Sequence, residues 1–536
     1  MNMSKPVIRF CLNGNWIEEA AVSSDMTVLR YLRTQQALPG TKEGCGSGDC
    51  GACSILLGEL SIDESGERKW QYQAINGCIS FIAQLDGKSL ITVDALATKG
   101  SAKEKTSDQL HPAQQAMVDY HGSQCGFCTP GIVMSLAALH ENQAGEPADH
   151  HQIIDALSGN LCRCTGYRPI IEAAQNMSNY QNNSADAGQV GIWQPAAETT
   201  AKSKAIVDVA AETEAGLFHA ASNSDIASQS WSPKTEDELK TLLAQYPEAR
   251  MVAGGTDIAL EVTQMSRRLP QLIAINDIAS LKTITIEDDS ILIGAGVTYS
   301  QMEATLNEHF PEFGQLLHRF ASRQVRNNGT MGGNVANASP IGDTPPVLLA
   351  LEACIELASA EGNRWLPLHE FFLDYKKTQQ KQGEYLRMIR IPRLQENQSL
   401  KVYKISKRLE DDISAVLAAF KFTLEGKVGA QTVTVVTSGF GGMAGIPKAA
   451  TNLEQALLNK EVSMQAFEQA AQVLGQDFAP MTDVRATSEY RMQVAQNLIQ
   501  KCAFELSNPN SLTRIESLDN SELSLAQVKT EVANHA

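Results

Sequence analysis

The sequence predicts an α+β protein built from several domains. Its 536 residues correspond to three or four domains of ordinary size. Hydrophobic residues make up 43% of the chain and charged residues 20%, a globular composition that excludes a wholly disordered or fibrous protein. The spacing of apolar residues is strand-like up to about residue 95, helical between 105 and 178, and mixed from Trp231 onward. We therefore expect sheet and helical domains in series.

The chain carries a net charge of −17, which argues against nucleic acid or an anionic membrane as its main partner. The first residues lack the apolar segment of a signal peptide, and no apolar run reaches the ~18 residues of a membrane span. We therefore expect a soluble, cytoplasmic chain. In such a reducing compartment, grouped cysteines indicate metal ligands or catalytic thiols rather than disulfides.

Residues 1–97 are expected to form a small mixed domain of strands with a short helix. Asn13-Gly14 is a dipeptide typical of hairpin turns, and Thr27 begins the helix. The expected strands cover residues 7–12, 15–21, 54–57, 72–75 and 90–93.

Residues 98–178 are expected to form a compact helical bundle, because apolar residues recur at i, i+3 and i+4. Residues 179–226 are rich in Asn, Ser, Ala, Thr and Glu and have weak periodicity, so they predict a flexible linker. The predicted helices cover residues 111–120, 130–139, 153–157 and 169–174.

The pattern after residue 226 mixes strands and helices again. We expect one domain over 227–394 and another over 395–508, followed by a polar, frayed tail at 509–536. In the second of these domains, strands between 403 and 442 precede helices at 452–458 and 464–474.

The strongest chemical signal is a glycine-rich loop that contains Cys45, Cys50 and Cys53. The spacing C-x₄-C-x₂-C with a distant fourth cysteine, here Cys78, is that of plant-type [2Fe–2S] proteins. Glycines let such a loop wrap closely and point backbone N–H groups at the cluster sulfurs. A structural zinc site is the alternative, but zinc prefers paired C-x₂₋₄-C knuckles. We therefore predict that these four cysteines hold a [2Fe–2S] cluster.

A second group consists of two pairs, Cys125 with Cys128 and Cys162 with Cys164. Each pair precedes a predicted helix, whose N-terminal N–H groups and partial positive charge favour thiolates and an anionic cluster. Taken alone, the pairs could also bind zinc, although two ligands one residue apart strain such a site. Beside a first iron–sulfur site, a second one is favoured. The remaining cysteines are isolated and expected to be buried as small apolar residues: Cys11, Cys354 and Cys502.

Two glycine-rich segments lie in the 227–394 domain. Residues 251–258 predict a strand that runs into a glycine turn, which can present successive N–H groups to a pyrophosphate. Residues 327–340 offer a second backbone-rich segment. Neither matches the phosphate-binding loop G-x-x-x-x-G-K-[ST]. The G-x-G-x-x-A match at 439–444 lacks a following helix and a ribose-binding acid, so we expect a tight turn there.

The cysteine motifs resemble the iron–sulfur part of the molybdenum hydroxylases, the family of the xanthine dehydrogenases and aldehyde oxidases. Two hallmark sequences are complete here, Gln-Cys-Gly-Phe-Cys-Thr-Pro-Gly at 124–131 and Gly-Asn-Leu-Cys-Arg-Cys-Thr-Gly-Tyr at 159–167. The resemblance covers nearly the whole chain. It implies a β-grasp ferredoxin-like domain, a four-helix [2Fe–2S] domain, a FAD-binding α+β domain without a Rossmann fold and a small α/β C-terminal domain, in that order.

The resemblance also implies a flavin site. Phe320 is expected beside the isoalloxazine ring, with Asp411 near it, and Tyr375 where nicotinamide docks. Read without the resemblance, Phe320 and Tyr375 would be core aromatics, and Lys404 and Asp411 would be solvated charges. The loop expected to hold the pyrophosphate and adenine consists of Val252, Ala253, Gly254, Gly255, Thr256, Asp257, Ile258 and Ala259. The ribityl and phosphate contacts are expected from Thr330, Gly333, Asn334, Ser339 and Asp343, and the site is completed by Leu386 and Lys404.

The functional expectation is the electron-transfer subunit of a two-subunit enzyme of the xanthine dehydrogenase type. No stretch of the chain is left for a molybdopterin domain, so a separate large subunit would oxidise hypoxanthine and xanthine to urate. Electrons would pass through the second cluster, then the first, to FAD and finally to NAD⁺. No side chain of this chain is expected to be catalytic on the purine.

Two alternatives remain open beside this expectation. The chain could be the equivalent subunit of an aldehyde or aromatic-compound hydroxylase, or a zinc-binding scaffold protein that is not an enzyme. The resemblance further implies a dimer of heterodimers.

Overall fold

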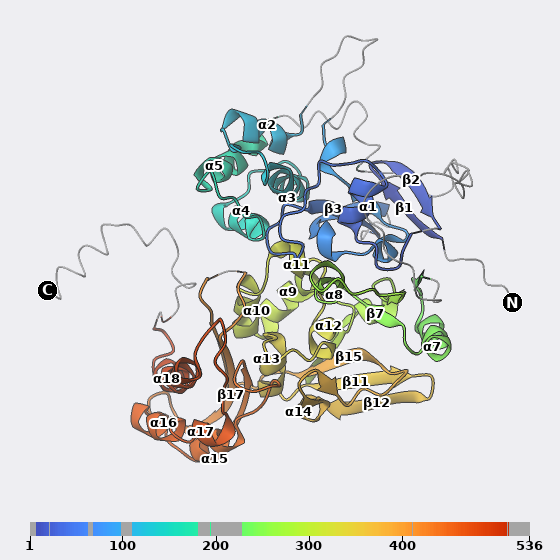
Figure 1. Cartoon of the computed structure of the whole chain (residues 1–536). Coiled ribbons are helices and arrows are strands. Elements are labelled where there is room, and N and C mark those ends of the chain that lie inside the picture. The colour runs from blue at the N-terminus through green and yellow to red at the C-terminus, as the bar shows by residue number, and fades with distance from the viewer. Residues whose placement is uncertain are drawn as a thin grey trace, which may run out of the picture.

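The computed structural model describes residues 7–20, 22–62, 68–97, 110–180, 193, 228–409, 411–511 and 513. Most of the linker expected at 179–226 and most of the tail expected at 509–536 lie outside these residues. Figure 1 shows the N-terminal sheet and the helical segment side by side, with the third segment beneath them and the C-terminal segment at its flank. Within the described chain, no helix is both long and apolar enough to cross a membrane.

The N-terminal segment forms a five-stranded mixed sheet in the order β2-β1-β5-β3-β4. Asn13 and Gly14 have φ values of 51° and 83°, as a mirror-image hairpin turn requires. Thr27 caps the helix α1 (Val28–Thr34) by accepting from the backbone N–H of Arg30. The strands are β1 (Ile8–Leu12), β2 (Asn15–Glu19), β3 (Ser54–Ile62), β4 (Arg68–Asn76) and β5 (Ser89–Ile91).

Four helices follow, as expected. Their buried faces share one core with the sheet residues Leu56, Tyr72 and Ile91, so the two segments are packed together rather than merely linked. Trp193 is buried against the same core, with its ring 5.1 Å from that of Tyr72. The helices are α2 (Pro112–Asp119), α3 (Thr129–Asn142), α4 (His150–Leu157) and α5 (Arg168–Asn176).

The third segment contains two larger sheets and a short hairpin. A parallel sheet has the order β6-β8-β7, and an antiparallel sheet has the order β12-β11-β15-β10-β9. The three-stranded parallel sheet is too small for a doubly wound nucleotide fold, so the expected absence of a Rossmann fold is confirmed. The strands are β6 (Gln229–Trp231), β7 (Arg250–Val252), β8 (Gln271–Ala274), β9 (Ile284–Ile286), β10 (Ser290–Gly294), β11 (Cys354–Ser359), β12 (Gly362–Pro367) and β15 (Tyr385–Pro392), with the hairpin β13 (Phe372–Asp374) and β14 (Lys377–Thr378).

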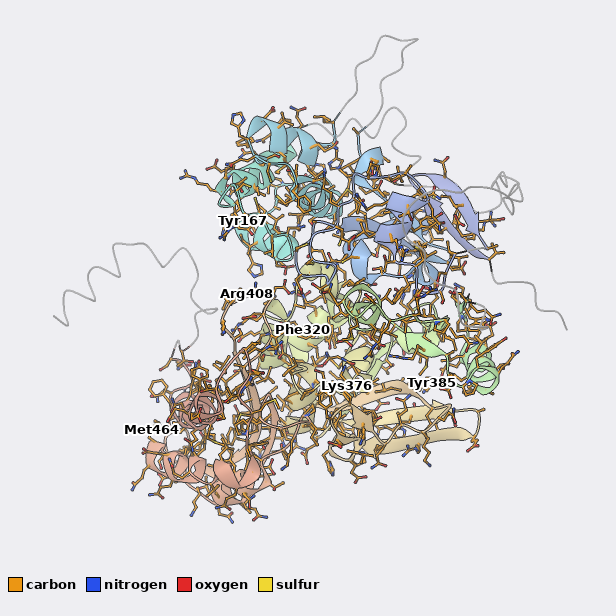
Figure 2. All side chains as sticks on the ribbon, viewed as in Figure 1. Tyr167, Phe320, Lys376, Tyr385, Arg408 and Met464 are labelled. Atoms are coloured by element: carbon orange, nitrogen blue, oxygen red, sulfur yellow. The ribbon has the colours of Figure 1, made fainter. Side chains whose placement is uncertain are left out.

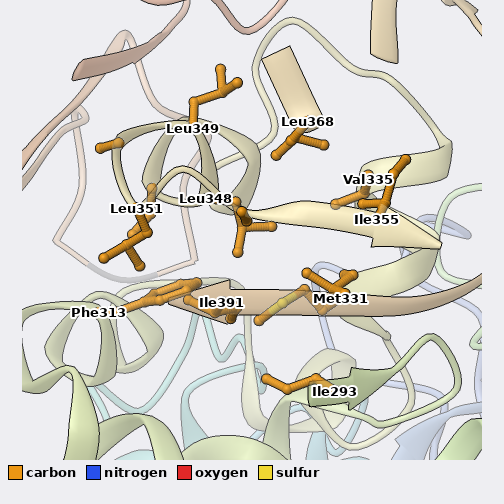
Figure 3. Packing of buried hydrophobic residues seen from close by; sticks show 14 of the residues in the cluster. Ile293, Phe313, Met331, Val335, Leu348, Leu349, Leu351, Ile355, Leu368 and Ile391 are labelled. Carbon is orange, nitrogen blue, oxygen red and sulfur yellow. The ribbon is translucent and has the colours of Figure 1, made fainter. Parts of the chain in front are cut away.

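Helices of this segment cover the antiparallel sheet. Figure 3 shows Leu348 of α13 facing Ile355 of β11 and Ile391 of β15 in a core of buried apolar side chains. Burial of these side chains is the main source of stability here. The helices are α7 (Glu236–Gln245), α8 (Ala259–Thr263), α9 (Tyr299–His309), α10 (Pro311–His318), α11 (Arg323–Arg326), α12 (Met331–Ala336), α13 (Thr344–Ala350) and α14 (Leu368–Phe371).

The C-terminal segment is an antiparallel sheet, β16-β17-β18, packed on helices that follow it in sequence. The expected turn at 439–444 begins only at Gly442, with φ of 77°, because residues 439–441 are the end of β18; no helix follows before Thr451. The elements are β16 (Gln398–Ile405), β17 (Val416–Glu425), β18 (Thr432–Gly441), α15 (Thr451–Leu457), α16 (Met464–Ala471), α17 (Leu474–Asp477) and α18 (Ser488–Ser507).

Candidate cofactor sites

The first cysteine group converges as the spacing predicts. Cys45, Cys50 and Cys53 lie in the loop between α1 and β3, and Cys78 lies in a 3₁₀ turn that follows β4. Hydrogen bonding with Cys50 and Cys78 lowers the pKa of the Cys45 thiol. The thiols of Cys45 and Cys53 raise the pKa of Cys78, because they surround it in a buried position. The four sulfurs therefore gather at one place.

Backbone groups of this loop already point at the sulfurs. The N–H of Cys45 donates to Cys50 Sγ at 3.3 Å, and the N–H of Ser47 donates to Cys45 Sγ at 3.4 Å. A Cβ at Gly44 would lie 2.7 Å from Cys50 Sγ. The loop has a glycine where a sulfur comes close to the backbone, and its N–H groups donate to thiolates. Both features fit a [2Fe–2S] cluster.

The second cysteine group also converges, nearer the surface. Hydrogen bonding links Cys125 with Cys164 and Cys128 with Cys162, so each bond joins one member of each pair. Cys125 and Cys164 are exposed. Burial raises the pKa of the Cys128 thiol to about 12. The four thiols lie just before the N-termini of two helices, α3, which begins at Thr129, and α5, which begins at Arg168. The partial positive charge of helix N-termini fits a site for an anionic cluster.

The turn before α5 is held by its own side chains. Tyr167, labelled in Figure 2, adopts φ of 68°, and its hydroxyl accepts from the N–H of Cys162 at 2.8 Å. The hydroxyl of Thr165 lies 3.1 Å from Cys162 Sγ. These contacts fix the orientation of Cys162.

The isolated cysteines differ in burial. Cys11 and Cys502 are fully buried, as expected. Cys354, at the start of β11, is only partly buried, which departs from the expectation. It lies at the first position of β11, at the end of an interior strand that pairs with β12 and β15.

The two glycine-rich stretches of the third segment, residues 251–258 and 327–340, lie side by side. Asn328 Nδ2 donates to the carbonyl oxygen of Gly254 at 2.8 Å. A Cβ at Gly254 would lie 2.1 Å from the carbonyl oxygen of Asn328, and Gly255 has φ of 81°. Both positions therefore require glycine. Asn328 has the role of joining the segments, which the glycine pattern alone did not indicate.

The second of these segments leaves polar groups accessible. Thr330 caps α12 by accepting from the N–H of Gly333 at 2.9 Å. Gly333 is exposed, while Asn334 and Ser339 are half-buried. Such an open surface of backbone and amide groups fits the phosphate-bearing part of a dinucleotide.

Asp343 and Lys404 meet in a buried ion pair. Lys404 Nζ donates to Asp343 Oδ2 at 2.6 Å, and Ser414 Oγ donates to Asp343 Oδ1 at 2.6 Å. The interpretation of Lys404 as a solvated charge is therefore wrong. Ser414 was not predicted, because a lone serine 71 residues from its partner leaves no sequence signal. Leu386 is buried in β15.

Phe320 lies where the third and C-terminal segments meet, near Arg408 in Figure 2. Its ring is only partly buried and packs 4.5 Å from that of Tyr299. The preceding residue, Arg319, donates to the carbonyl oxygens of Lys404 at 2.9 Å and Leu409 at 3.1 Å. Arg319 thus holds residues 404–409, which precede Asp411, in place through their backbone.

Asp411 and Tyr375 differ in their surroundings. Burial, followed by the negative charge of Asp49, raises the pKa of the Asp411 carboxyl to about 6. Asp411 is therefore not a fully solvated charge. Asp49, whose charge acts on it, belongs to the first cysteine loop, so Asp411 lies near that loop. Tyr375 is 60% exposed in the turn between β13 and β14, so it is not a core aromatic.

The first cysteine loop and the glycine turn of the third segment are in direct contact. A Cβ at Gly255 would lie 2.8 Å from the carbonyl oxygen of Ile79, the residue after Cys78. Gln84 Nε2 donates to the carbonyl oxygen of Ala253 at 2.7 Å, and Gln264 Nε2 donates to that of Cys45 at 3.0 Å. The two candidate sites are therefore neighbours.

Four family models match the chain in succession. Residues 10–83 match a 2Fe-2S iron-sulfur cluster binding domain, and residues 92–175 match a [2Fe-2S] binding domain. Residues 226–394 match the FAD binding domain in molybdopterin dehydrogenase, and residues 401–506 match the CO dehydrogenase flavoprotein C-terminal domain. Both cluster-binding domains and the FAD-binding domain are thus present.

Curated relatives match most of the chain. A xanthine dehydrogenase of Emericella nidulans is 31% identical over 512 residues, which are 88% of this chain and 36% of that protein. A xanthine dehydrogenase/oxidase of Gallus gallus is 29% identical over 566 residues, 94% of this chain and 41% of that protein. The chain thus spans less than half the length of these relatives. A solved structure of CO dehydrogenase from Oligotropha carboxidovorans is similar over 53% of this chain and 98% of its own, with 25% identity and a TM-score of 0.49.

Proposed function

Since this chain belongs to the molybdenum hydroxylase family, as the part that contains two [2Fe–2S] domains and an FAD-binding domain, we propose that it is the electron-transfer subunit of a two-subunit xanthine dehydrogenase. The proposed reaction is oxidation of hypoxanthine and xanthine to urate on a partner subunit. This chain would receive the electrons and pass them to NAD⁺.

One observation carries the proposal: the first cysteine site lies between the second and the flavin segment. On one side, the N–H of Leu161, next to Cys162, donates to the carbonyl oxygen of Cys50 at 3.0 Å. On the other side, the carbonyl oxygen of Ile79, next to Cys78, lies against Gly255. The first site thus contacts both of the others through the chain itself, and this arrangement supports electron flow from the second site through the first to the flavin.

The clusters would supply one-electron transfer, and the flavin would collect two electrons and deliver them as hydride. The chain's own residues would set geometry and electrostatics. Eight cysteine thiolates would hold the metals: Cys45, Cys50, Cys53, Cys78, Cys125, Cys128, Cys162 and Cys164. Backbone N–H groups such as that of Ser47 would stabilise added negative charge at the sulfurs.

The flavin would lie against both glycine-rich segments. The contact between Gly254 and Asn328 holds these segments together, and Gly333, Asn334 and Ser339 would meet its phosphates and ribityl chain. Phe320 would pack beside the ring. The Asp343–Lys404 ion pair would stabilise the protein wall of the flavin site, because both side chains are buried.

NAD⁺ is proposed to dock near Tyr375 and Asp411. The 60% exposure of Tyr375 leaves its ring available to stack on nicotinamide. Asp411 would influence the flavin through its charge, which depends on a pKa of about 6.

A molybdopterin-containing large subunit is the proposed partner, and a dimer of such heterodimers is the proposed assembly. The exposed cysteines of the second site are flanked by Phe127 and Leu161, which are 48% and 47% exposed. Large apolar side chains around an exposed redox site favour a protein partner there.

The test is to purify the chain with its native partner and to measure NADH formation with xanthine and with aldehydes. Xanthine-dependent NADH formation supports the proposal. NADH formation from aldehydes alone would replace the substrate class with that of an aldehyde hydroxylase. The chain by itself should contain iron and acid-labile sulfide, absorb with a flavin shoulder, and reduce an artificial dye with NADH. Zinc in place of iron, with no flavin, would reject the proposal.

A further inference from the structure

Asn160 occupies the point where three cofactor-binding segments touch. It is 2% exposed and precedes Leu161 and Cys162. Its Nδ2 donates to the carbonyl oxygen of Gly51, in the first cysteine loop, at 3.2 Å and to Oγ of Ser54, the first residue of β3, at 3.3 Å. The next residue, Leu161, donates its N–H to the carbonyl oxygen of Cys50. Consecutive residues of the second site thus bond to consecutive residues of the first.

Gln324 fastens this contact to the FAD-binding domain. It lies in α11 and is 1% exposed. Its Nε2 has three acceptors within hydrogen-bond distance and shares its two hydrogens among them: Asn160 Oδ1 at 2.9 Å, Ser135 Oγ at 2.9 Å and the carbonyl oxygen of Ala156 at 3.1 Å. The acceptors belong to α3, α4 and the turn that precedes Cys162. The two amides therefore form one buried polar connection among the three segments.

The packing around these amides leaves no space for side chains. A Cβ at Gly51 would lie 2.4 Å from Asn160 Nδ2, and a Cβ at Gly131 would lie 2.0 Å from the carbonyl oxygen of Gly51. A Cβ at Gly159 would lie 2.3 Å from Gln324 Oε1. Backbones approach this closely only where glycine permits it. In such close packing, the hydrogen bonds of Asn160 and Gln324 decide how the two cysteine loops align with each other. The reason is that a buried amide that loses its partners costs free energy of folding.

We propose that Asn160 and Gln324 are positioning residues that fix the two cysteine sites relative to each other and to the FAD-binding domain. They hold no cofactor atom themselves. Asn160 aligns the loop of Cys162 with the loop of Cys50. Gln324 holds these two loops against α11 of the FAD-binding domain. The inference rests on the proposed function only for its spectroscopic readout.

The test compares Asn160→Ala with Asn142→Ala in the full chain. Asn142 is a matched control, because its Nδ2 also donates to a backbone carbonyl of the N-terminal sheet, that of Tyr72 at 3.4 Å, but from the C-terminal end of α3, away from the cysteine loops. The first readout is hydrogen exchange of the peptide that contains the Leu161 N–H. Exchange should become about tenfold faster in Asn160→Ala, the factor for loss of roughly one hydrogen bond, and stay unchanged in Asn142→Ala.

The second readout is the magnetic interaction between the two reduced clusters in electron paramagnetic resonance. Asn160→Ala should change the splitting between the clusters, while the g-values of each cluster stay as in the wild type. A residue that only adds stability would lower the melting temperature without changing that splitting. Gln324→Met, which keeps the volume and removes the donor, should change the splitting in the same way and serves if Asn160→Ala fails to fold.

The outcomes separate the two proposals. Wild-type protein without two iron–sulfur signals overturns the proposed function, and the hydrogen-exchange comparison still tests the positioning role. Two normal wild-type signals, with unchanged splitting and exchange in both Asn160→Ala and Gln324→Met, overturn the positioning role. Equal effects of Asn160→Ala and Asn142→Ala also overturn it, because the contact would then be general packing.

Discussion

Lys404 Nζ donates to Asp343 Oδ2 at 2.6 Å, and the two side chains are only 2% and 6% exposed. The pair joins the third segment to β16 of the C-terminal segment, across 61 residues of sequence. Ser414 completes the coordination of the carboxylate. A buried, hydrogen-bonded charge pair thus ties the two segments together at the proposed flavin site.

Replacing Lys404 by Met should destabilise the protein, because Asp343 would keep a buried charge without its counter-ion. The free energy of unfolding should fall by about 3–5 kcal/mol, the range for breaking a buried pair. Flavin content should fall with it. Denaturant unfolding and flavin absorbance measure the two effects. Lys377→Met is the control, since its pair with Asp374 is exposed and contributes less than about 1 kcal/mol. Equal small losses in both variants would contradict the prediction.

Gly254→Ala should release the flavin and leave the clusters in place. The added Cβ would lie 2.1 Å from the carbonyl oxygen of Asn328, so the two glycine-rich segments must separate. We expect flavin content to fall by more than about half, with iron content unchanged, because overpacking of this kind costs about 1–3 kcal/mol locally. Gly445→Ala, which meets nothing within 4 Å, should retain flavin. Full flavin content in Gly254→Ala would show that the turn does not bind it.

Cys78→Ser should remove one cluster and not the other. Its sulfur is the fourth of the first site, and a hydroxyl ligates iron poorly in place of a thiolate. Iron content should fall by about half, with the resonance signal of one cluster retained. Cys354→Ser should leave iron unchanged, because Cys354 belongs to neither site. Unchanged iron in Cys78→Ser would refute the ligand assignment.

Asp411 should make stability depend on pH in a direction unusual for a carboxylate. Burial and the charge of Asp49 raise its pKa from 3.8 to about 6. The folded protein therefore binds this proton more tightly than the unfolded chain does, so the stabilisation is present at low pH and is lost as the pH rises through about 6. Between about pH 4 and pH 7, the wild type should lose about 2 kcal/mol relative to Asp411→Asn, because a shift of about two pKa units corresponds to roughly 3 kcal/mol in full.

Denaturant unfolding of both proteins at several pH values measures this difference. Asp374→Asn is a useful comparison, because the N–H of Tyr375 lowers the pKa of Asp374, so its pH dependence has the opposite sign. A difference between wild type and Asp411→Asn that is constant with pH would rule out the titration.

Tyr375→Ala should weaken NADH binding without affecting the flavin. The side chain is 60% exposed, so its removal should change stability little. Loss of one aromatic stacking contact predicts a KM for NADH about threefold to tenfold higher in the dye-reduction assay. Leu373→Ala, equally exposed on the same hairpin, is the control. An unchanged KM in Tyr375→Ala would place nicotinamide elsewhere.

The strands illustrate what local sequence can and cannot predict. The hairpin at Asn13-Gly14 follows from its turn chemistry alone. The strand expected at 54–57 runs to Ile62, because its whole length pairs with β4, Ser54 with Asn76 through Ile62 with Arg68. Residues such as Glu59 and Ser61 give no strand signal of their own. Pairing with a neighbour, rather than intrinsic preference, extends the strand.

The candidate sites divide in the same way. The cysteines and the glycine turns are visible in the sequence, because metal ligation and close backbone approach demand particular residue types at short spacing. Asn160, Gln324 and Ser414 were not predicted as contacts. Their residue types are common on protein surfaces, and only their burial among distant partners gives them a role.

The sequence by itself determined the residues of the candidate sites, eight cysteines in two spaced groups and two glycine-rich segments, and the order of strands and helices. Only the tertiary structure decided how these parts meet, with the loop of Cys50 against that of Cys162, Gly255 against Ile79, and Lys404 against Asp343. The physical reason is that ligand spacing and turn geometry are local properties of the chain. Buried hydrogen bonds and ion pairs instead depend on packing between residues far apart in sequence, which periodicity and spacing do not encode.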